Sequence, residues 1–232
     1  MNIITGDIHD VIKNLPSNTF DLLYTDPPFS MTKASWDKDL RWNELWTDIW
    51  RVLKPKGIVV LHSTQRFTIR LCSSQLKYFR YKWIWEKNRV TNFFIAKKQP
   101  LRKYEDIAVF YRKTGTYNPQ MVGNKFFKKR NVKFGGKEEY YGKDTKHKDN
   151  WGEETIKGGH IGRYPTDILR YDVRKGTGGA STRPNELVDY MIKTYSNIGD
   201  HILDICCYDA LTGKRAIQLQ RNYTGIDLNP IL

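Results

Sequence analysis

Short apolar runs alternate with amphipathic stretches along most of the chain. The runs have the length and the β-branched and aromatic content of buried strands, and the stretches between them repeat apolar residues at helical spacing. The predicted strands are Ile3–Ile4, Phe20–Thr25, Ile58–His62, Tyr81–Trp85, Ile107–Tyr111, His201–Ile205 and Tyr223–Ile226. The predicted helices are His9–Leu15, Asp39–Leu53, Gln65–Phe79, Pro184–Tyr195 and Thr212–Leu219. This alternation predicts an α/β fold with a mostly parallel sheet.

The periodicity is lost from Arg112 to Asn150, where lysines, arginines and aromatic residues are interleaved. The chain as a whole carries a formal charge of +14, which indicates a polyanionic partner, and nucleic acid is the first candidate. Within this stretch, Lys128, Lys129 and Arg130 are the predicted contacts to phosphate groups.

The cysteines and the N-terminus indicate the compartment. Cys72, Cys206 and Cys207 form no Cys-x-x-Cys or Cys/His cluster, so we expect reduced thiols and no structural metal. The N-terminus lacks the charged and apolar regions of a signal peptide, and no apolar run approaches the roughly 18 residues that span a bilayer. We therefore expect a cytoplasmic protein that does not associate with membranes.

The segment with the clearest chemistry follows the strand Phe20–Thr25 and reads Asp26, Pro27, Pro28, Phe29. The prolines fix their own φ angles and lack backbone N–H groups, so the carbonyl oxygens of this turn remain free as acceptors. Asp26 would lie at the carboxyl end of a strand, where open α/β sheets bind their ligands. A carboxylate, a free carbonyl and an aromatic ring in one turn can bind a flat heterocycle that carries an amino group.

A second pair of strands, near the C-terminus, has the pattern of a nucleoside-binding unit. Asp204 ends one strand and is followed by a loop and a helix, and Asp227 ends the next strand. A junction between a loop and a helix, followed by an acidic residue about 20 positions later, is typical of sites that hold a nucleoside cofactor.

Together these segments resemble the β-class DNA amino-methyltransferases, which carry an Asp-Pro-Pro-Tyr/Phe motif. Further segments that resemble this family are Asn2–Asp7, Trp83–Asn88, Tyr104–Phe110 and Thr182–Pro184 with the helix that follows. The resemblance implies a Rossmann-like, circularly permuted fold that binds S-adenosyl-L-methionine, with helices on both faces of the sheet. It implies a catalytic half at 1–111, a target-recognition insert at 112–175 and a cofactor-binding half at 176–232.

The resemblance also implies roles for single residues. Asp26, Pro27, Pro28 and Phe29 would bind the target base, which is flipped out of double-stranded DNA. The cofactor would be bound by Asp7, Thr182, Arg183, Asp204, Cys206, Tyr208 and Asp227. The family pattern favours transfer to adenine N6 over cytosine N4, and a homodimer or a partner subunit is compatible with it.

The chain departs from the family pattern in the loop after Asp204. Tyr208 and Ala210 stand where the family has glycines, which are used where φ is positive. Arg183 stands where a lysine is usual. These departures leave open a catalytically degenerate DNA-binding subunit of the same fold. A third alternative, a methyltransferase for RNA or a small molecule, would keep the cofactor site and change the substrate.

Overall fold

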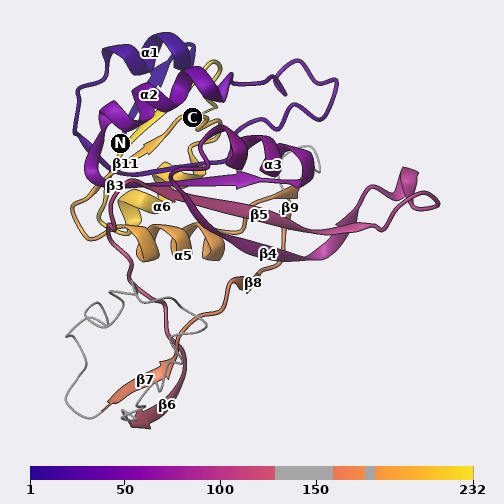
Figure 1. Cartoon of the computed structure of the whole chain (residues 1–232), viewed down its shortest axis with the longest axis vertical. Helices are drawn as coiled ribbons and strands as arrows, with labels where there is room; N and C mark the ends of the chain where they lie inside the picture. The colour runs from indigo at the N-terminus through magenta and orange to yellow at the C-terminus, as the bar shows by residue number, and fades with distance from the viewer. Residues whose placement is uncertain (129–158, 176–180, 232) are drawn as a thin grey trace, which may run out of the picture. The chain divides into compact units, whose positions relative to one another are not determined.

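The computed structural model describes residues 1–128, 159–175 and 181–231. Their main feature is an eight-stranded sheet (Figure 1). In order across the sheet, its strands are β1 (Asn2–Thr5), β12 (Asn222–Asp227), β11 (His201–Asp204), β2 (Phe20–Thr25), β3 (Leu53–Ser63), β5 (Arg102–Tyr111), β4 (Phe79–Thr91) and β8 (Ile168–Arg170).

The neighbouring strands β1, β12, β11, β2 and β3 are parallel to one another. Strand β5 runs antiparallel to both of its neighbours, β3 and β4. The C-terminal strands β11 and β12 lie between the N-terminal strands β1 and β2. This order confirms the predicted fold class, a mostly parallel Rossmann-like sheet in which the two halves are permuted along the chain.

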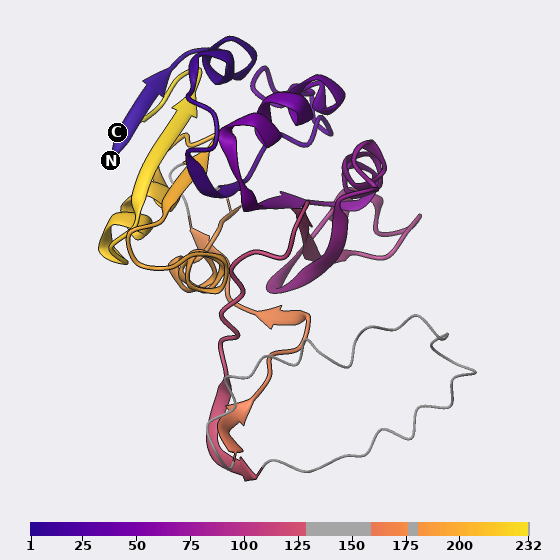
Figure 2. The same cartoon turned by 60° about the vertical axis from the view of Figure 1, so that its left-hand side comes forward.

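Helices cover both faces of the sheet, as Figure 2 shows. The helices are α1 (Ile8–Asn14), α2 (Trp42–Val52), α3 (Gln65–Ser74), α5 (Asn185–Tyr195) and α6 (Leu211–Gln218). Successive residues of a strand point to opposite faces. Accordingly, Leu23 of β2 packs into the core with α1, α2 and α3, whereas Leu22 and Tyr24 pack into the core with α5 and α6. Every residue of β2 except Asp21 is buried, which explains its almost continuous apolar sequence.

Several predicted elements differ from the structure in their bounds: β3 and β5 each begin five residues before the predicted strands at Ile58 and Ile107, and α2 begins at Trp42 rather than at Asp39. The helix that begins at Gln65 ends at Ser74 rather than at Phe79, and β4 runs from Phe79 to Thr91, far beyond the predicted Tyr81–Trp85. The polar half of β4 has no apolar pattern, because it pairs with β5 as a two-stranded arm rather than packing in the core.

The chain divides into two compact units, Met1–Asn118 with Thr166–Leu232, and Pro119–Pro165. The second unit contains the antiparallel strands β6 (Val122–Lys128) and β7 (Gly159–Arg163), and its bounds lie inside the predicted insert. The first unit also contains the 3-10 helix η1 (Phe93–Ile95) and the short paired strands β9 (Arg174–Lys175) and β10 (Ser181–Thr182). Within the described residues, no helix is long and apolar enough to cross a membrane.

Candidate active site

The parallel strands carry the predicted acidic residues to one edge of the sheet. Asp204 and Asp227 are the last residues of β11 and β12, Asp26 follows β2 directly, and Asp7 follows β1 after Gly6. Carboxyl ends of neighbouring parallel strands lie side by side, so residues from both ends of the chain meet here. The acidic residues of the site therefore come from both ends of the chain, as the permuted strand order requires.

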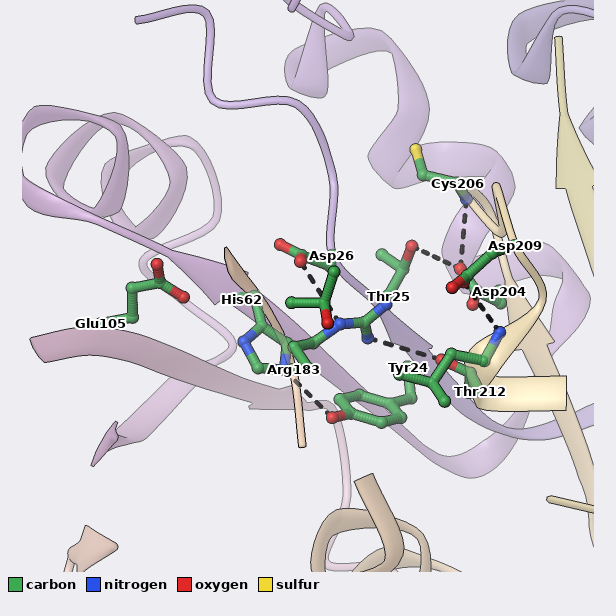
Figure 3. A network of polar contacts seen from close by, with 12 residues as sticks. Tyr24, Thr25, Asp26, His62, Glu105, Arg183, Asp204, Cys206, Asp209 and Thr212 are labelled. Carbon is green, nitrogen blue, oxygen red and sulfur yellow. Dashed lines mark hydrogen bonds and ion pairs between the residues drawn. The ribbon is translucent and has the colours of Figure 1, made fainter. Parts of the chain in front are cut away.

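Asp26 forms an ion pair with Arg183 across the two halves (Figure 3). Nε of Arg183 lies 3.3 Å from Oδ2 of Asp26, and the side chains are 10% and 32% exposed, respectively. Arg183 also donates from Nη1 to Oγ1 of Thr212, at 3.4 Å, and its guanidinium lies 5.9 Å from the ring centroid of Tyr24. One buried guanidinium therefore joins the Asp-Pro-Pro-Phe turn to the start of α6.

The surroundings of Asp26 bring the pKa of its carboxyl group close to neutral pH. Burial raises the pKa of Asp26 to about 6, while the positive charge of Arg183 opposes this rise. Glu105 raises the pKa further and Lys87 lowers it. Asp26 is thus mostly ionised at neutral pH, but it takes up a proton far more readily than an ordinary aspartate.

Lys87 and Glu105 form a second, largely buried ion pair near Asp26. Their side chains are 8% and 13% exposed, and Nζ of Lys87 also lies 4.6 Å from the ring centroid of Trp85. The sequence places these residues in the family-like segments Trp83–Asn88 and Tyr104–Phe110, but it gives no indication that they pair.

Behind Asp26, the hydroxyl of Tyr24 hydrogen-bonds to Nε2 of His62 at 3.0 Å. Both side chains are fully buried. Burial lowers the pKa of His62 well below its usual value, and the charges of Arg183 and Lys87 lower it further, so the imidazole is neutral. Nδ1 of His62 has no hydrogen-bond partner in the described part of the chain. Tyr24 and His62 could not be identified from the sequence, since both look like ordinary residues at the ends of buried strands.

The turn after Asp26 is fixed at its aromatic end. The ring of Phe29 packs against Phe67 with centroids 5.3 Å apart, and its carbonyl accepts a hydrogen bond from Nη2 of Arg70 at 3.2 Å. Further along, the carboxylate of Asp37 accepts three backbone N–H groups from residues 30–32, at 2.6 to 2.9 Å. Pro27 and Pro28 both have trans peptide bonds.

Asp204 is fully buried, unlike the other acidic residues of this edge. Its Oδ1 accepts from Oγ1 of Thr25 at 2.6 Å and from the backbone N of Cys206 at 3.2 Å, and its Oδ2 accepts from the hydroxyl of Tyr223 at 3.3 Å. These contacts tie the loop after β11 to the strand that carries Asp26.

Asp227 and Asp7 organise the backbone next to this loop. Asp227 accepts from the backbone N of Tyr208 at 2.8 Å and from that of Asn229 at 2.9 Å. Asp7 caps α1 by accepting from the backbone N of His9 at 2.8 Å. Asp7 is exposed and Asp227 is partly exposed, so both carboxylates retain acceptor capacity for a bound ligand.

The loop between Asp204 and α6 has the backbone that its family position predicts. Tyr208 and Ala210 have φ angles of +40° and +52°. The Tyr208 side chain is turned outward, with 58% of the residue exposed, whereas Ala210 is buried and precedes the first turn of α6. The non-glycine residues therefore adopt the left-handed conformation at a cost of about 1–2 kcal/mol each, and the loop keeps its course without glycine.

The remaining predicted residues lie in three places. Thr182 is partly buried in β10 and donates to the carbonyl of Arg174 at 3.3 Å, directly beside Arg183. Lys128 is the last residue of β6, in the second unit. Lys129 and Arg130 lie outside the described residues.

Comparison with known proteins identifies the family of the chain. A family model described as DNA methylase (N6_N4_Mtase) matches residues 20–231, and the chain therefore belongs to this family. The chain is 25% identical over 240 residues to the DNA adenine methyltransferase YhdJ of Escherichia coli strain K12, across 98% of this chain and 78% of the relative. It is 23% identical to the type II methyltransferase M1.MboII of Moraxella bovis, across 95% and 88% of the two chains.

Solved structures show the same fold. The PvuII DNA methyltransferase, which is cytosine-N4-specific, superposes with a TM-score of 0.65 at 13% identity and covers 98% of this chain and 82% of its own. M1.HpyAVI, solved as a complex with S-adenosyl-L-methionine, gives a TM-score of 0.59 at 19% identity, with coverage of 97% and 92%.

Proposed function

We propose that this protein transfers a methyl group from S-adenosyl-L-methionine to the exocyclic amino group of a base flipped out of double-stranded DNA. The observation that carries the proposal is the position of Asp26: a carboxylate at the end of β2, 32% exposed, with a raised pKa and the buried guanidinium of Arg183 beside it. Membership in the DNA methylase family supports the reaction class.

The residues present fit the cofactor. Asp227 and Asp7 offer carboxylate oxygens at the edge of the loop for the ribose hydroxyls and the adenine amino group, respectively, and Asp204 fixes the loop between them. Arg183 follows β10 directly and hydrogen-bonds to Thr212 at the start of α6, where the same loop ends, and Thr182 precedes it in the chain. When bound, the cofactor supplies an electrophilic methyl group on a sulfonium.

Asp26 and the carbonyl of Pro27 would each accept one N–H of the target amino group. Accepting both bonds reduces delocalisation of the nitrogen lone pair into the ring, so the nitrogen becomes a better nucleophile. Uptake of the methyl group that the cofactor would supply, with the carbon–sulfur bond broken in exchange, would leave the amino nitrogen with a positive charge and one proton to lose. Asp26, with a pKa of about 6, can accept this proton and then release it to water. Phe29 would cover one face of the base. Positioning and electrostatics account for catalysis, without a covalent intermediate.

Adenine is the favoured target. The relative with 25% identity is named an adenine methyltransferase, whereas the cytosine-N4-specific structure shares 13%. Nucleoside analysis of the methylated DNA tests this preference directly: N6-methyladenine is expected, and N4-methylcytosine would overturn it.

The test replaces Asp26 with alanine or asparagine. Transfer of tritiated methyl from labelled cofactor to unmethylated plasmid DNA should fall by at least about 100-fold, the usual cost of losing one preorganised hydrogen-bonding group at a reacting centre. DNA affinity should stay within a few fold. Asp10→Asn is the control, because Asp10 is an exposed acid on α1. Transfer at the wild-type rate by the Asp26 variants would refute the proposal.

A second function is favoured by the strained loop. If the positive φ angles of Tyr208 and Ala210 leave no room for the cofactor, the chain is a DNA-binding subunit without activity of its own. Calorimetric titration with S-adenosyl-L-methionine separates the two functions. Heat of binding at a 1:1 ratio would exclude the second one, in which the chain does not bind the cofactor.

A further inference from the structure

Two phenylalanines at the end of the β4–β5 arm are left in solvent. Phe93 and Phe94 are 67% and 88% exposed, and they form η1, the short turn that joins the two strands. Figure 1 shows the arm extending beyond α3 and away from the helices of its own unit. Two adjacent exposed aromatic side chains at the end of a projecting hairpin contribute nothing to the core, so they indicate a surface for a partner.

The charge around this turn is entirely positive. Residues 88–103 contain five lysines and arginines and no acidic residue. Lys103 pairs with Glu86, and Arg102 hydrogen-bonds to Thr91 and Thr64. The other three cations are exposed and form no ion pair with the described residues; they are Arg89, Lys97 and Lys98. Free cations beside exposed aromatic rings are complementary to a nucleic acid, which offers phosphates and flat bases.

The topology places this turn at the same edge of the sheet as Asp26. Strand β4 runs in the direction of β2, because β5 is antiparallel to both β3 and β4. In the sheet, Thr25 pairs with Leu61, and Leu61 pairs with Ala108. From Ala108, strand β5 extends six residues further along the arm, as far as Arg102. Six residues of strand correspond to about 20 Å, so the turn projects well past the level of Asp26 on the side where DNA would approach.

We propose that the β4–β5 arm enters duplex DNA and that Phe93 and Phe94 occupy the base stack at the position left by the flipped base. This inference rests on the proposed function, since Asp26 receives the base that the phenylalanines replace. Apolar side chains that insert between base steps are a general means of holding a duplex unstacked. Arg89, Lys97 and Lys98 would contact the flanking phosphates.

The test compares Phe93→Ala/Phe94→Ala with a matched control, Ile69→Ala/Leu76→Ala. The control removes two side chains of similar exposure, 68% and 69%, that lie outside the arm, on and just after α3. Each protein is assayed for methyl transfer to native plasmid DNA and to the same plasmid after heat denaturation, and for binding to a labelled random-sequence duplex. Unchanged thermal midpoints and cofactor binding verify that the variants are folded.

The phenylalanine variant should transfer methyl to native DNA at least about tenfold more slowly, given the usual value of aromatic stacking on a base. On denatured DNA, where the bases are already unpaired, its rate should change less than about twofold. The control should match the wild type on both. Equal rates of wild type and variant on native DNA, or an equal loss on both substrates, would overturn the proposal.

Failure of the proposed function has a different signature. If the wild type transfers methyl to neither native nor denatured DNA, the proposed function is wrong. Binding to the labelled duplex then tests by itself whether the arm contacts DNA. Weaker duplex binding by the phenylalanine variant would keep the arm as a DNA contact, whereas equal binding would remove it.

Discussion

Replacing Arg183 with glutamine should move the acidic limb of the pH–rate profile to higher pH. The change removes the guanidinium that lies 3.3 Å from Oδ2 of Asp26. At an effective dielectric constant of about 20, two unit charges at this distance interact by about 5 kcal/mol, which is an upper limit because Asp26 retains contact with water. Measured effects of one adjacent opposite charge are about 1–3 pKa units. The pKa of Asp26, now about 6, should therefore rise to between about 7 and 9.

The loss of activity follows from the ionised fraction of Asp26. With a pKa of about 6, about nine in ten carboxyls are ionised at pH 7. With a pKa of about 8, about one in ten is ionised, so kcat/KM at pH 7 should fall roughly tenfold and recover in alkaline solution.

The stability of the folded chain should depend on the same carboxyl. Because the folded pKa of Asp26 lies above its ordinary value of 3.8, protonation favours the folded state. This contribution is complete below pH 3.8 and is lost as the pH rises through about 6. In Arg183→Gln the loss should extend to higher pH.

Single-turnover methyl transfer to plasmid DNA, measured from mildly acidic to alkaline pH at saturating cofactor, tests the prediction. Arg183→Lys keeps the charge and should shift the limb less, and Lys103→Gln removes an exposed cation that pairs with Glu86. If the acidic limb of the pH–rate profile lies at the same pH in Arg183→Gln as in the wild type, the assignment of Asp26 as the titrating group is refuted. A loss that is equal at every pH, with weaker cofactor binding by calorimetry, would show that Arg183 acts on the cofactor instead.

Three further predictions concern the loop, the insert and the packing of α6. Replacing Tyr208 and Ala210 with glycine should relieve positive φ angles and tighten cofactor binding, which the wild type is expected to show only at about 100 μM or weaker; tight binding by the wild type would contradict this. Replacing Lys128–Arg130 with alanines should flatten the salt dependence of DNA binding by about 0.9 in log–log slope per lost contact, and an unchanged slope would exclude these contacts. Gly213→Ala places a Cβ 2.5 Å from the ring of Tyr223 and should lower stability to urea by about 1–3 kcal/mol, which equal unfolding midpoints would refute.

The arrangement of the site around Asp26 could be predicted only in part. The sequence identifies the strand Phe20–Thr25, because a strand buried on both faces consists of nearly consecutive apolar residues. It also identifies the turn that follows, because prolines constrain their own backbone. It also indicates positive φ at Tyr208 and Ala210, through the glycines that occupy these positions in the family. Both features are local, since each depends on a few neighbouring residues.

Tertiary structure alone decided which charged groups meet. Arg183 reaches Asp26 from a segment more than 150 residues away, and Lys87 pairs with Glu105 because β4 and β5 share a particular register. Asp204 and Asp227 look equivalent in the sequence, yet one is buried under Thr25 and Tyr223 and the other remains partly exposed. Hydrophobic periodicity records which face of an element is buried, but pairing depends on strand order, register and rotamers, which are set when the whole core packs.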